Sequence, residues 1–293
     1  MAQIAWIGAG KMGLPICKRL KAAGHDVRVL ARTAERGEEF AALGLGSGPD
    51  VATLINAADI IFTCVSDDAA LANVVLSDAF KSALPKLATF IDMSTVSPEV
   101  SVKISNHLPK SFKYLRSPVS GSTAMAEAGT LTALVSGPKS AFDACAPLFA
   151  TYAKKAFYLG EAEEARYLKL AINSMVCSTS VLLGEALAFG LKGGLTHELM
   201  LEVITQSAVA SPLIGYKKDM IISGDYRPAA TLDMLKKDLD LLLFAASEMN
   251  APLPVNEMIR DVYSKAIERG LGGRDFFVLV EEAEKAAGVV VKK

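Results

Sequence analysis

The sequence has few cysteines, few histidines and almost no net charge, and these shortages exclude several classes of function. Its four cysteines are far apart, and no two of them form a C-x-x-C pair. They fit packing roles in a reducing compartment better than metal ligation, so no metal site is expected. The formal net charge is −1, and basic residues are adjacent only in pairs such as Lys236-Lys237 and Lys292-Lys293. Nucleic-acid binding is therefore not expected.

A basic, signal-like segment is also missing, since the opening residues, AQIAWIGAG, are typical of a short strand. An apolar run from Met175 to Leu191 is nearly long enough to cross a membrane, but Glu185 interrupts it and Lys192 follows it closely. We interpret this run as part of a buried helix of a soluble protein. The expectation is a cytoplasmic protein with no membrane partner.

Length and composition predict a globular protein of two domains. A chain of 293 residues can bury a large core, and 51% hydrophobic with 22% charged residues is typical of a folded chain. Short apolar strands alternate with helices in the first half, whereas the second half has a helical pattern throughout. We predict an α/β Rossmann-type dinucleotide-binding domain over residues 1–161, an all-α helical bundle domain over residues 162–293, and a long interdomain helix joining them.

A glycine-rich segment follows the first predicted strand, Ile4 to Ile7, and opens a helix. Strand, G-x-G-x-x-G and amphipathic helix in this order form the dinucleotide fingerprint. The first glycine permits a tight turn, the second leaves room for the pyrophosphate, and the third lets helix and strand pack closely. The helix N-terminus then presents unpaired N–H groups to the phosphates. The predicted cofactor-binding residues here are Gly8, Ala9, Gly10, Lys11, Met12 and Gly13.

The end of the second predicted strand, Asp26 to Leu30, indicates which dinucleotide is bound. An NAD-selective protein usually places Asp or Glu there, to accept from the ribose 2′-hydroxyl. This chain has Ala31, followed by Arg32 and Thr33. A guanidinium can pair with a 2′-phosphate, and a hydroxyl can donate one more hydrogen bond. We predict NADP(H) over NAD(H), the alternative being a solvated arginine near a helix start.

Small polar residues follow two further predicted strands, Ile60 to Cys64 and Thr89 to Asp92. The carboxyl ends of parallel strands form the ligand crevice of an open α/β sheet. Next along the chain, Ser97 is typical of an N-cap, with Pro98 as the first helical residue. We predict that Val65 and Ser66, after the first of these strands, contact the cofactor. Ser94 and Thr95, after the second, are predicted to contact the cofactor or the substrate, the alternative being that they only cap and turn the chain.

Hydroxyl groups flank a glycine in a third loop, Ser117 to Thr123, which opens another predicted helix. Free N–H groups and O–H donors at a helix start can hold a carboxylate, although an ordinary capped turn has the same composition. The candidate residues are Ser120, Gly121 and Ser122.

One long helix is predicted from Gly160 to about Gly194, because this segment lacks proline and is apolar on most faces. A lysine and an amide one turn apart near its start are what a carbonyl-reducing site needs. They begin a stripe of small or polar residues in steps of three and four: Lys169, Asn173, Cys177, Ser180 and Gly184. Further helices are predicted over residues 198–206, 212–222, 231–249, 254–269 and 276–287.

Hydride addition to a carbonyl needs a proton donor for the developing alkoxide. None of the three histidines is well placed, since His25 lies in a turn, His107 near a helix end and His197 near a helix start. Lys169 is the remaining candidate, because an ammonium donates a proton during reduction and an amine accepts one during oxidation. The alternative is a surface lysine that follows two glutamates by one turn.

Together these residues resemble the β-hydroxyacid dehydrogenase family, which includes 3-hydroxyisobutyrate dehydrogenase, tartronate semialdehyde reductase, and the glyoxylate and succinic semialdehyde reductases. The resemblance implies a Rossmann domain, an all-helical domain, a cleft between them crossed by the long helix, and a homodimer or homotetramer formed through the helical domains. Five motifs match in order: GAGKMGLP at 8–15, DMSTVSPE at 92–99, SPVSGS at 117–122 with AGTL at 128–131, the helix with Lys169 and Asn173, and Lys237-Asp238-Leu239.

The resemblance also implies roles for single residues. Lys169 would be the catalytic acid/base, and Asn173 would position the substrate. Thr95 and Lys237 would contact the nicotinamide side of the cofactor. The substrate, a small carboxylate, would contact Ser94, Ser120, Gly121, Ser122, Lys169, Asn173 and Lys237.

Three positions depart from the family pattern. Arg116 stands where an acid is common, Ile172 where an asparagine is common, and Ala230 where a phenylalanine is common. Arg116 either adds positive charge to the site or pairs with a local acid. These departures leave the particular substrate open, but not the reaction type.

The favoured hypothesis is an NADP(H)-dependent reductase of a short aldehyde or keto acid, such as glyoxylate or a succinic or tartronate semialdehyde. One alternative is the NAD(P)-dependent oxidation of a 3-hydroxy acid, such as 3-hydroxyisobutyrate or a serine-like compound. Another is a non-catalytic NADP-binding scaffold protein on the same fold. Because such relatives tend to lose the helix lysine, Lys169 favours an enzyme.

Overall fold

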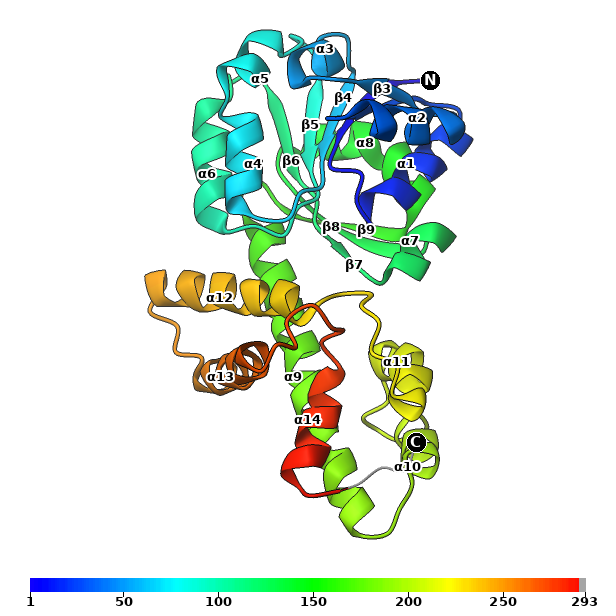
Figure 1. Ribbon diagram of the computed structural model, residues 1–293. Helices are drawn as coiled ribbons and strands as arrows, with labels where there is room; N and C mark the ends of the chain where they lie inside the picture. Colours follow the sequence, from blue (N-terminus) through cyan, green and yellow to red (C-terminus); the bar gives the residue numbers. More distant parts are fainter. Residues whose placement is uncertain (290–293) are drawn as a thin grey trace. The chain divides into compact units, whose positions relative to one another are not determined.

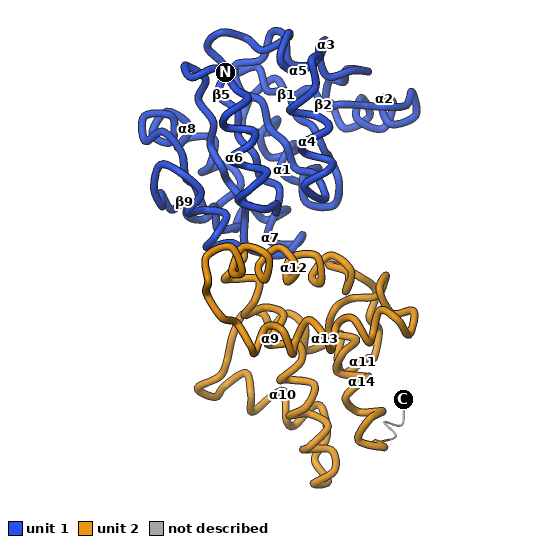
Figure 2. The backbone as a smooth tube through the Cα atoms, turned by 90° about the vertical axis from the view of Figure 1, so that its left-hand side faces the viewer, with its two compact units in different colours: residues 1–169 blue, residues 170–293 orange. Residues whose placement is uncertain are grey.

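The computed structural model describes residues 1–289, which divide into a first compact unit, Met1–Lys169, and a second that begins at Leu170 (Figure 2). The division falls within one long helix, α9 (Glu164–Lys192), which links the two units (Figure 1). The predicted fold class, a Rossmann-type domain followed by a helical domain with a long helix between them, is confirmed. The domain boundary predicted between residues 161 and 162 lies just before this helix.

The first unit contains a nine-stranded sheet, formed by β1 (Gln3–Ile7), β2 (Asp26–Leu30), β3 (Gly46–Gly48), β4 (Ile60–Thr63), β5 (Thr89–Asp92), β6 (Lys113–Arg116), β7 (Val119–Ser120), β8 (Leu131–Ser136) and β9 (Ala153–Gly160). The first six strands are parallel, in the order β3-β2-β1-β4-β5-β6. β8 is antiparallel to β6 and β7 and parallel to β9. Since β2 and β4 flank β1 on opposite sides, the strand order reverses there, and such a point places a ligand at the carboxyl ends of the strands.

Helices cover both faces of this sheet (Figure 1). In β1, Ile4 and Trp6 belong to one core cluster, whereas Ala5 and Ile7 belong to another. A strand buried on both faces is nearly continuously apolar, as residues 4–7 of this strand are. The helices are α1 (Gly13–Ala22), α2 (Ala34–Ala42), α3 (Val51–Ile55), α4 (Asp68–Val75), α5 (Asp78–Ala83), α6 (Pro98–His107), α7 (Thr123–Ala128) and α8 (Lys139–Tyr152).

The second unit is helical and continues from α9 through α10 (His197–Ile204), α11 (Pro212–Ser223), α12 (Leu232–Glu248), α13 (Pro254–Glu268) and α14 (Val278–Ala286). Its core cluster contains Cys177, Leu183 and Leu187 from α9. By length and composition alone α9 could cross a membrane, and 44% of the apolar window within it is buried inside the structure. Because these three residues are buried in the core of the second unit, this part of α9 packs against the other helices of that unit.

Most predicted elements are present, with small shifts at their ends. Ser97 caps α6 by accepting from Val100 N, and Pro98 occupies the first turn, as predicted. The helix predicted from residue 160 begins instead at Glu164, because Gly160 still belongs to β9, with a φ of +144°. The sequence patterns do not predict β3 and β7, whose short glycine- or serine-containing segments are typical of turns.

Candidate active site

The glycine-rich loop between β1 and α1 has the shape that a dinucleotide needs. Gly8 has a φ of +98°, and a Cβ there would lie 2.2 Å from the carbonyl oxygen of Cys64. A Cβ at Gly13 would lie 2.5 Å from Gly8 O, so this glycine lets the helix approach the strand. Gly10 is exposed, and a Cβ there would meet no described atom within 4 Å. The loop therefore leaves open space where a pyrophosphate is expected to pass.

The first turn of α1 suits a phosphate group. Within the described chain, the N-cap residue Met12 makes no side-chain capping hydrogen bond, and the first turn holds no acidic residue. Leu14 N donates to Gly10 O at 3.0 Å within this turn, and the helix dipole favours an anion at this end of α1. Of the other predicted residues, Ala9 is buried and Lys11 is exposed. The loop and the helix start together fit a dinucleotide.

The residues predicted to hold a 2′-phosphate lie at the end of β2. Arg32 is exposed, and Thr33 caps α2 by accepting a hydrogen bond from Arg36 N. Sequence reasoning missed Arg36, whose Nη2 donates to the carbonyl oxygen of Ala9 at 3.2 Å and whose Nη1 pairs with Glu39. Arg36 therefore connects α2 with the glycine-rich loop. The sequence signal for Arg36 is its position four residues after Arg32, in the first turn of the helix that follows β2.

The loops after β4 and β5 are joined by hydrogen bonds. Ser94 is 2% exposed, and its Oγ accepts from Val65 N at 3.0 Å. Its hydroxyl is therefore used within the fold. Thr95 is half-buried, and the exposed Ser66 donates its hydroxyl to Asp67 at 2.6 Å. All four predicted residues of these loops lie at the carboxyl edge of the parallel strands, where a ligand crevice is expected.

The residues predicted to hold the substrate's carboxylate lie between β7 and α7. Ser122 is the N-cap of α7 and accepts from Met125 N at 3.3 Å. Gly121 is exposed with a φ of +139°, and a Cβ there would lie 2.7 Å from the Leu131 side chain. Ser120 is half-buried at the end of β7. The backbone at Gly121 thus has a conformation that L side chains rarely adopt.

Arg116, one of the departures from the family pattern, pairs with Glu163 in the interior of the first unit. The two side chains are 6% and 8% exposed, and the guanidinium lies 4.1 Å from the centre of the Tyr114 ring. Of the two interpretations of Arg116, pairing with a local acid is therefore confirmed. It adds no exposed positive charge to the site.

Lys169 and Asn173 lie one turn apart on α9, Lys169 half-buried and Asn173 8% exposed. Within the second unit, Asn173 Nδ2 donates to Asp238 Oδ2 at 2.6 Å, and Lys237 Nζ lies 3.0 Å from Asp238 Oδ1. Asp238 thus brings together Asn173 from α9 and Lys237 from α12. Sequence reasoning missed the role of Asp238. The signal that could have indicated it is its position beside Lys237 in the K-D-L motif.

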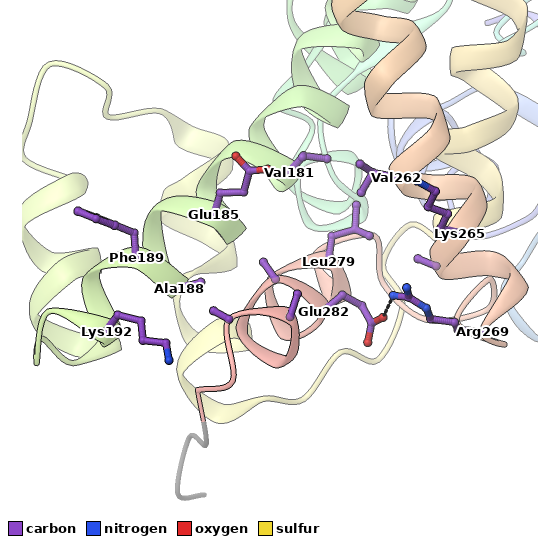
Figure 3. Close-up of a pocket in the computed structure, with 14 residues that line it drawn as sticks. Val181, Glu185, Ala188, Phe189, Lys192, Val262, Lys265, Arg269, Leu279 and Glu282 are labelled. Atoms are coloured by element: carbon purple, nitrogen blue, oxygen red, sulfur yellow. Dashed lines mark hydrogen bonds and ion pairs between the residues drawn. The ribbon is translucent and has the colours of Figure 1, made fainter.

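A separate pocket of about 500 Å³ lies in the second unit between α9, α13 and α14 (Figure 3). Apolar side chains such as Val181 and Leu279 line it, and an ion pair between Arg269 and Glu282 at 2.7 Å stands at one side. Of the described residues that form this pocket, none belongs to the predicted site. The pocket is therefore not the candidate active site.

Comparisons with known proteins identify the family. The NAD binding domain of 6-phosphogluconate dehydrogenase matches residues 3–160, and the NAD-binding domain of NADP-dependent 3-hydroxyisobutyrate dehydrogenase matches residues 164–282. A 2-(hydroxymethyl)glutarate dehydrogenase from Eubacterium barkeri is 31% identical over 292 residues, which cover 99% of this chain and 97% of that protein. The chain belongs to the β-hydroxyacid dehydrogenase family. Both matching domain models are described as binding a nicotinamide dinucleotide, in agreement with the glycine-rich loop of the first unit.

Two solved structures share the fold of this chain, and a further relative matches it in sequence. The 3-hydroxyisobutyrate dehydrogenase of Salmonella typhimurium has a TM-score of 0.85 at 20% identity, with 96% of this chain and 100% of that chain covered. The enzyme of the same name from Mycobacterium tuberculosis, solved with L-serine, has a TM-score of 0.85 at 24% identity, with 96% and 99% covered. The cytokine-like nuclear factor N-PAC of Homo sapiens is 29% identical over 267 residues, 90% of this chain, and the chain spans about half of its length (48%).

Proposed function

We propose that this chain reduces a short aldehyde or keto acid to the hydroxy acid with NADP(H). The observation that carries this proposal is the pair of Lys169 and Asn173 on one face of α9, in a chain whose glycine-rich loop fits a dinucleotide. A bound nicotinamide supplies the hydride, or accepts it in the reverse direction. The residues of the chain hold the two molecules and exchange the proton.

Proton transfer is assigned to Lys169. As an ammonium it donates a proton to the oxygen that becomes an alkoxide, and as an amine it accepts that proton when the alcohol is oxidised. Asn173 orients the substrate, because its amide is held by Asp238. A carboxylate only accepts hydrogen bonds, so Asp238 selects one orientation of the amide and presents a preset partner to the substrate.

The substrate's carboxylate is assigned to Ser120, Gly121 and Ser122. The loop combines two hydroxyls with backbone N–H groups, and each of these can donate to an anion. Support comes from the backbone at Gly121, where a positive φ keeps the loop in one tight conformation. Lys237, which pairs with Asp238, is assigned to the nicotinamide side, together with Thr95.

The preference for NADP(H) rests on two arginines at the end of β2. Arg32 is exposed, and Arg36 reaches the carbonyl oxygen of Ala9 in the glycine-rich loop. Two guanidinium groups beside the ribose would neutralise a 2′-phosphate, and the hydroxyl of Thr33 adds a donor. An NAD-selective protein would place a carboxylate there to accept from the 2′-hydroxyl.

The relative from Eubacterium barkeri supports a substrate with a primary alcohol next to a carboxylate-bearing carbon. Oxidation of such an alcohol yields an aldehyde acid, so 3-hydroxy acid oxidation and aldehyde acid reduction are opposite directions of one reaction. The NAD(P)-dependent oxidation of 3-hydroxyisobutyrate or a serine-type compound is the second candidate. The N-PAC relatives are named as nuclear factors. They support a third candidate function, a non-catalytic scaffold protein that binds the dinucleotide.

We also propose a homodimer or homotetramer in the cytoplasm. Met175, Leu182 and Phe189 are 71%, 62% and 83% exposed and recur every seven residues on α9, so they share one face. A row of large exposed apolar side chains usually marks an interaction surface. None of the four cysteines, all within the described residues, forms a disulfide, which suits a reducing compartment. Light scattering of the purified chain measures the oligomeric state, and a monomer would contradict this part of the proposal.

The test of the function is a spectrophotometric assay of reduced nicotinamide in both directions. NADPH and NADH are offered with glyoxylate, succinic semialdehyde or tartronate semialdehyde. NADP⁺ and NAD⁺ are offered with 3-hydroxyisobutyrate, L-serine or 2-(hydroxymethyl)glutarate. We expect the highest kcat/KM with NADPH and an aldehyde acid. Tight NADPH binding by fluorescence, without turnover of any of these compounds, would instead support the scaffold.

A further inference from the structure

Arg166 and Asp92 form an ion pair inside the first unit, with side chains only 1% and 0% exposed. Burial acts to lower the pKa of Arg166, but Asp92, Tyr114 and Glu163 together raise the pKa by more, so the guanidinium stays charged. A buried ion pair often adds no stability over well-packed apolar side chains of similar volume. Stability alone therefore does not account for the pair, and its geometry points to another role.

The guanidinium of Arg166 uses all of its nitrogens. Nη1 donates to the carbonyl oxygen of Ser94 at 2.6 Å, and Nη2 donates to Tyr114 Oη at 3.1 Å and to Asp92. Nε donates to Ser101 Oγ at 3.4 Å. These acceptors surround the planar fork, which presents five donors in a rigid arrangement. A lysine ammonium in the same place cannot reach them all, so the contacts are specific for arginine.

Asp92 connects this guanidinium to the ends of two strands. Its Oδ1 accepts from Thr63 Oγ1 at 2.7 Å and from Ser94 N at 3.0 Å. Ser94 Oγ in turn accepts from Val65 N at 3.0 Å. Arg166 is thus tied to the loops after β4 and β5, which carry the residues assigned to the cofactor, Val65, Ser66 and Thr95.

The same arginine stands in the first turns of α9, three residues before Lys169. Three residues correspond to about 4.5 Å along a helix axis, so the two side chains leave α9 within one turn. Just before the helix, Glu163 is held by its buried ion pair with Arg116. The start of α9 is therefore held at two points within the first unit, and Lys169 follows directly.

We propose that Arg166 is a positioning residue, which holds the first turns of α9, and with them Lys169, in a set place relative to the loops after β4 and β5. The inference rests on the proposed function, because Lys169 is the proton donor there. Arg166 is 1% exposed, so it acts through Lys169 and not on a ligand. Replacing it would move the amine without removing any group that binds the dinucleotide.

The test compares Arg166→Lys, which keeps the charge but loses the fork, with Lys217→Arg as a matched control. Lys217 pairs with Asp275 in the second unit, with side chains 3% and 0% exposed, so the control also exchanges the cation of a buried pair. Tyr114→Phe removes one hydrogen-bond acceptor of the Arg166 guanidinium while the ion pair with Asp92 remains. This variant replaces Arg166→Lys in the experiment if Arg166→Lys folds poorly. Melting temperatures confirm that each variant is folded.

The first measurement needs neither substrate nor cofactor. The protein is acetylated with trace acetic anhydride at a series of pH values, and labelling of Lys169 is quantified by mass spectrometry with the exposed Lys192 as internal reference. In Arg166→Lys we expect Lys169 to label faster relative to Lys192 across the pH series. Lys217→Arg should keep the wild-type profile. An unchanged Lys169 profile in Arg166→Lys and Tyr114→Phe, or an equal change in Lys217→Arg, would overturn the proposal.

The second measurement is kinetic. A displaced amine should lower kcat of Arg166→Lys by about 10- to 100-fold, with the dissociation constant of NADPH close to that of the wild type. Equal losses in kcat and NADPH affinity would indicate general disorder and count against positioning. If the wild-type protein turns over no substrate, the proposed function fails, whereas the labelling profile still decides whether Arg166 positions Lys169.

Discussion

Asn173 Nδ2 lies 2.6 Å from Asp238 Oδ2, which joins the amide on α9 to a buried carboxylate on α12. The other oxygen of the same carboxylate lies 3.0 Å from Lys237 Nζ. A single acid therefore orients one residue assigned to the substrate and one assigned to the cofactor. Because the carboxylate can only accept, the Asn173 amide turns its NH₂ group towards Asp238.

Asp238→Asn tests this arrangement. The substitution keeps the size of the side chain but removes its charge, so Asn173 loses its strong acceptor and Lys237 loses its counter-ion. We expect kcat/KM for the acid substrate to fall by about 10- to 100-fold, the range for a hydrogen bond to a charged group. Asp240→Asn, on the same helix and paired with Lys236 at 2.6 Å, is the control and should remain near wild type. Equal effects of the two substitutions would contradict the role of Asp238.

Lys169→Ala removes the proposed proton donor. Loss of a general acid usually slows a reaction by about 10²- to 10⁴-fold, and we expect kcat to fall within this range. Affinity for NADPH should hold, since the glycine-rich loop is untouched. Lys192→Ala, at the exposed end of the same helix, is the matched control. Steady-state rates and fluorescence titration check both expectations, and near-normal turnover of Lys169→Ala would remove the lysine from the mechanism.

Two glycines of the dinucleotide loop should respond differently to the same substitution. A Cβ at Gly13 would lie 2.5 Å from Gly8 O and 2.9 Å from Trp6 Nε1, so Gly13→Ala should lower the free energy of unfolding by about 1–3 kcal/mol. A Cβ at Gly10 meets no described atom within 4 Å, so Gly10→Ala should keep its melting temperature but bind NADPH weakly. Calorimetry and titration of both variants test this contrast. A stable Gly10→Ala that binds normally would place the pyrophosphate elsewhere.

Arg32→Ala should change the choice of dinucleotide. Loss of a charge-assisted hydrogen bond to the 2′-phosphate should raise KM for NADPH by about 10- to 100-fold and leave KM for NADH nearly unchanged. Arg36→Ala should affect both dinucleotides, because Arg36 also donates to Ala9 O in the glycine-rich loop. Arg28→Ala, on the exposed side of β2, serves as the control. A wild-type enzyme that prefers NADH would contradict the assignment before any substitution is made.

The buried thiols predict a loss of stability at alkaline pH. Burial, and then the nearby Asp92 charge, raise the pKa of Cys64 from 9.0 to about 12, and burial raises that of Cys145 to about 11. Between pH 9 and these values the unfolded chain loses thiol protons that the folded chain keeps. Stability present below pH 9 is therefore lost progressively as pH rises towards 12. Melting temperatures across this range should fall less steeply in Cys64→Ala than in the wild type, and equal slopes would contradict the prediction.

Local patterns were sufficient for the elements and motifs. The glycine-rich loop, the cap at Ser97 and the helix that carries Lys169 all depend on neighbours within a turn or two, and the structure has them. The helix start was misplaced, because whether Gly160 ends a strand depends on its pairing with Ser136 in β8. The roles of the individual site residues stay predictions until the variants are measured.

By itself the sequence determined most of the strands and helices, the dinucleotide loop and the family, because these follow from periodicity and from motifs of a few adjacent residues. Only the tertiary structure decided which acid each buried cation meets. Arg116 pairs with Glu163, Arg166 with Asp92 and Lys217 with Asp275, and the partners are 47, 74 and 58 residues apart. A charge in the interior needs a partner of opposite sign, but the packing of the whole fold selects which one.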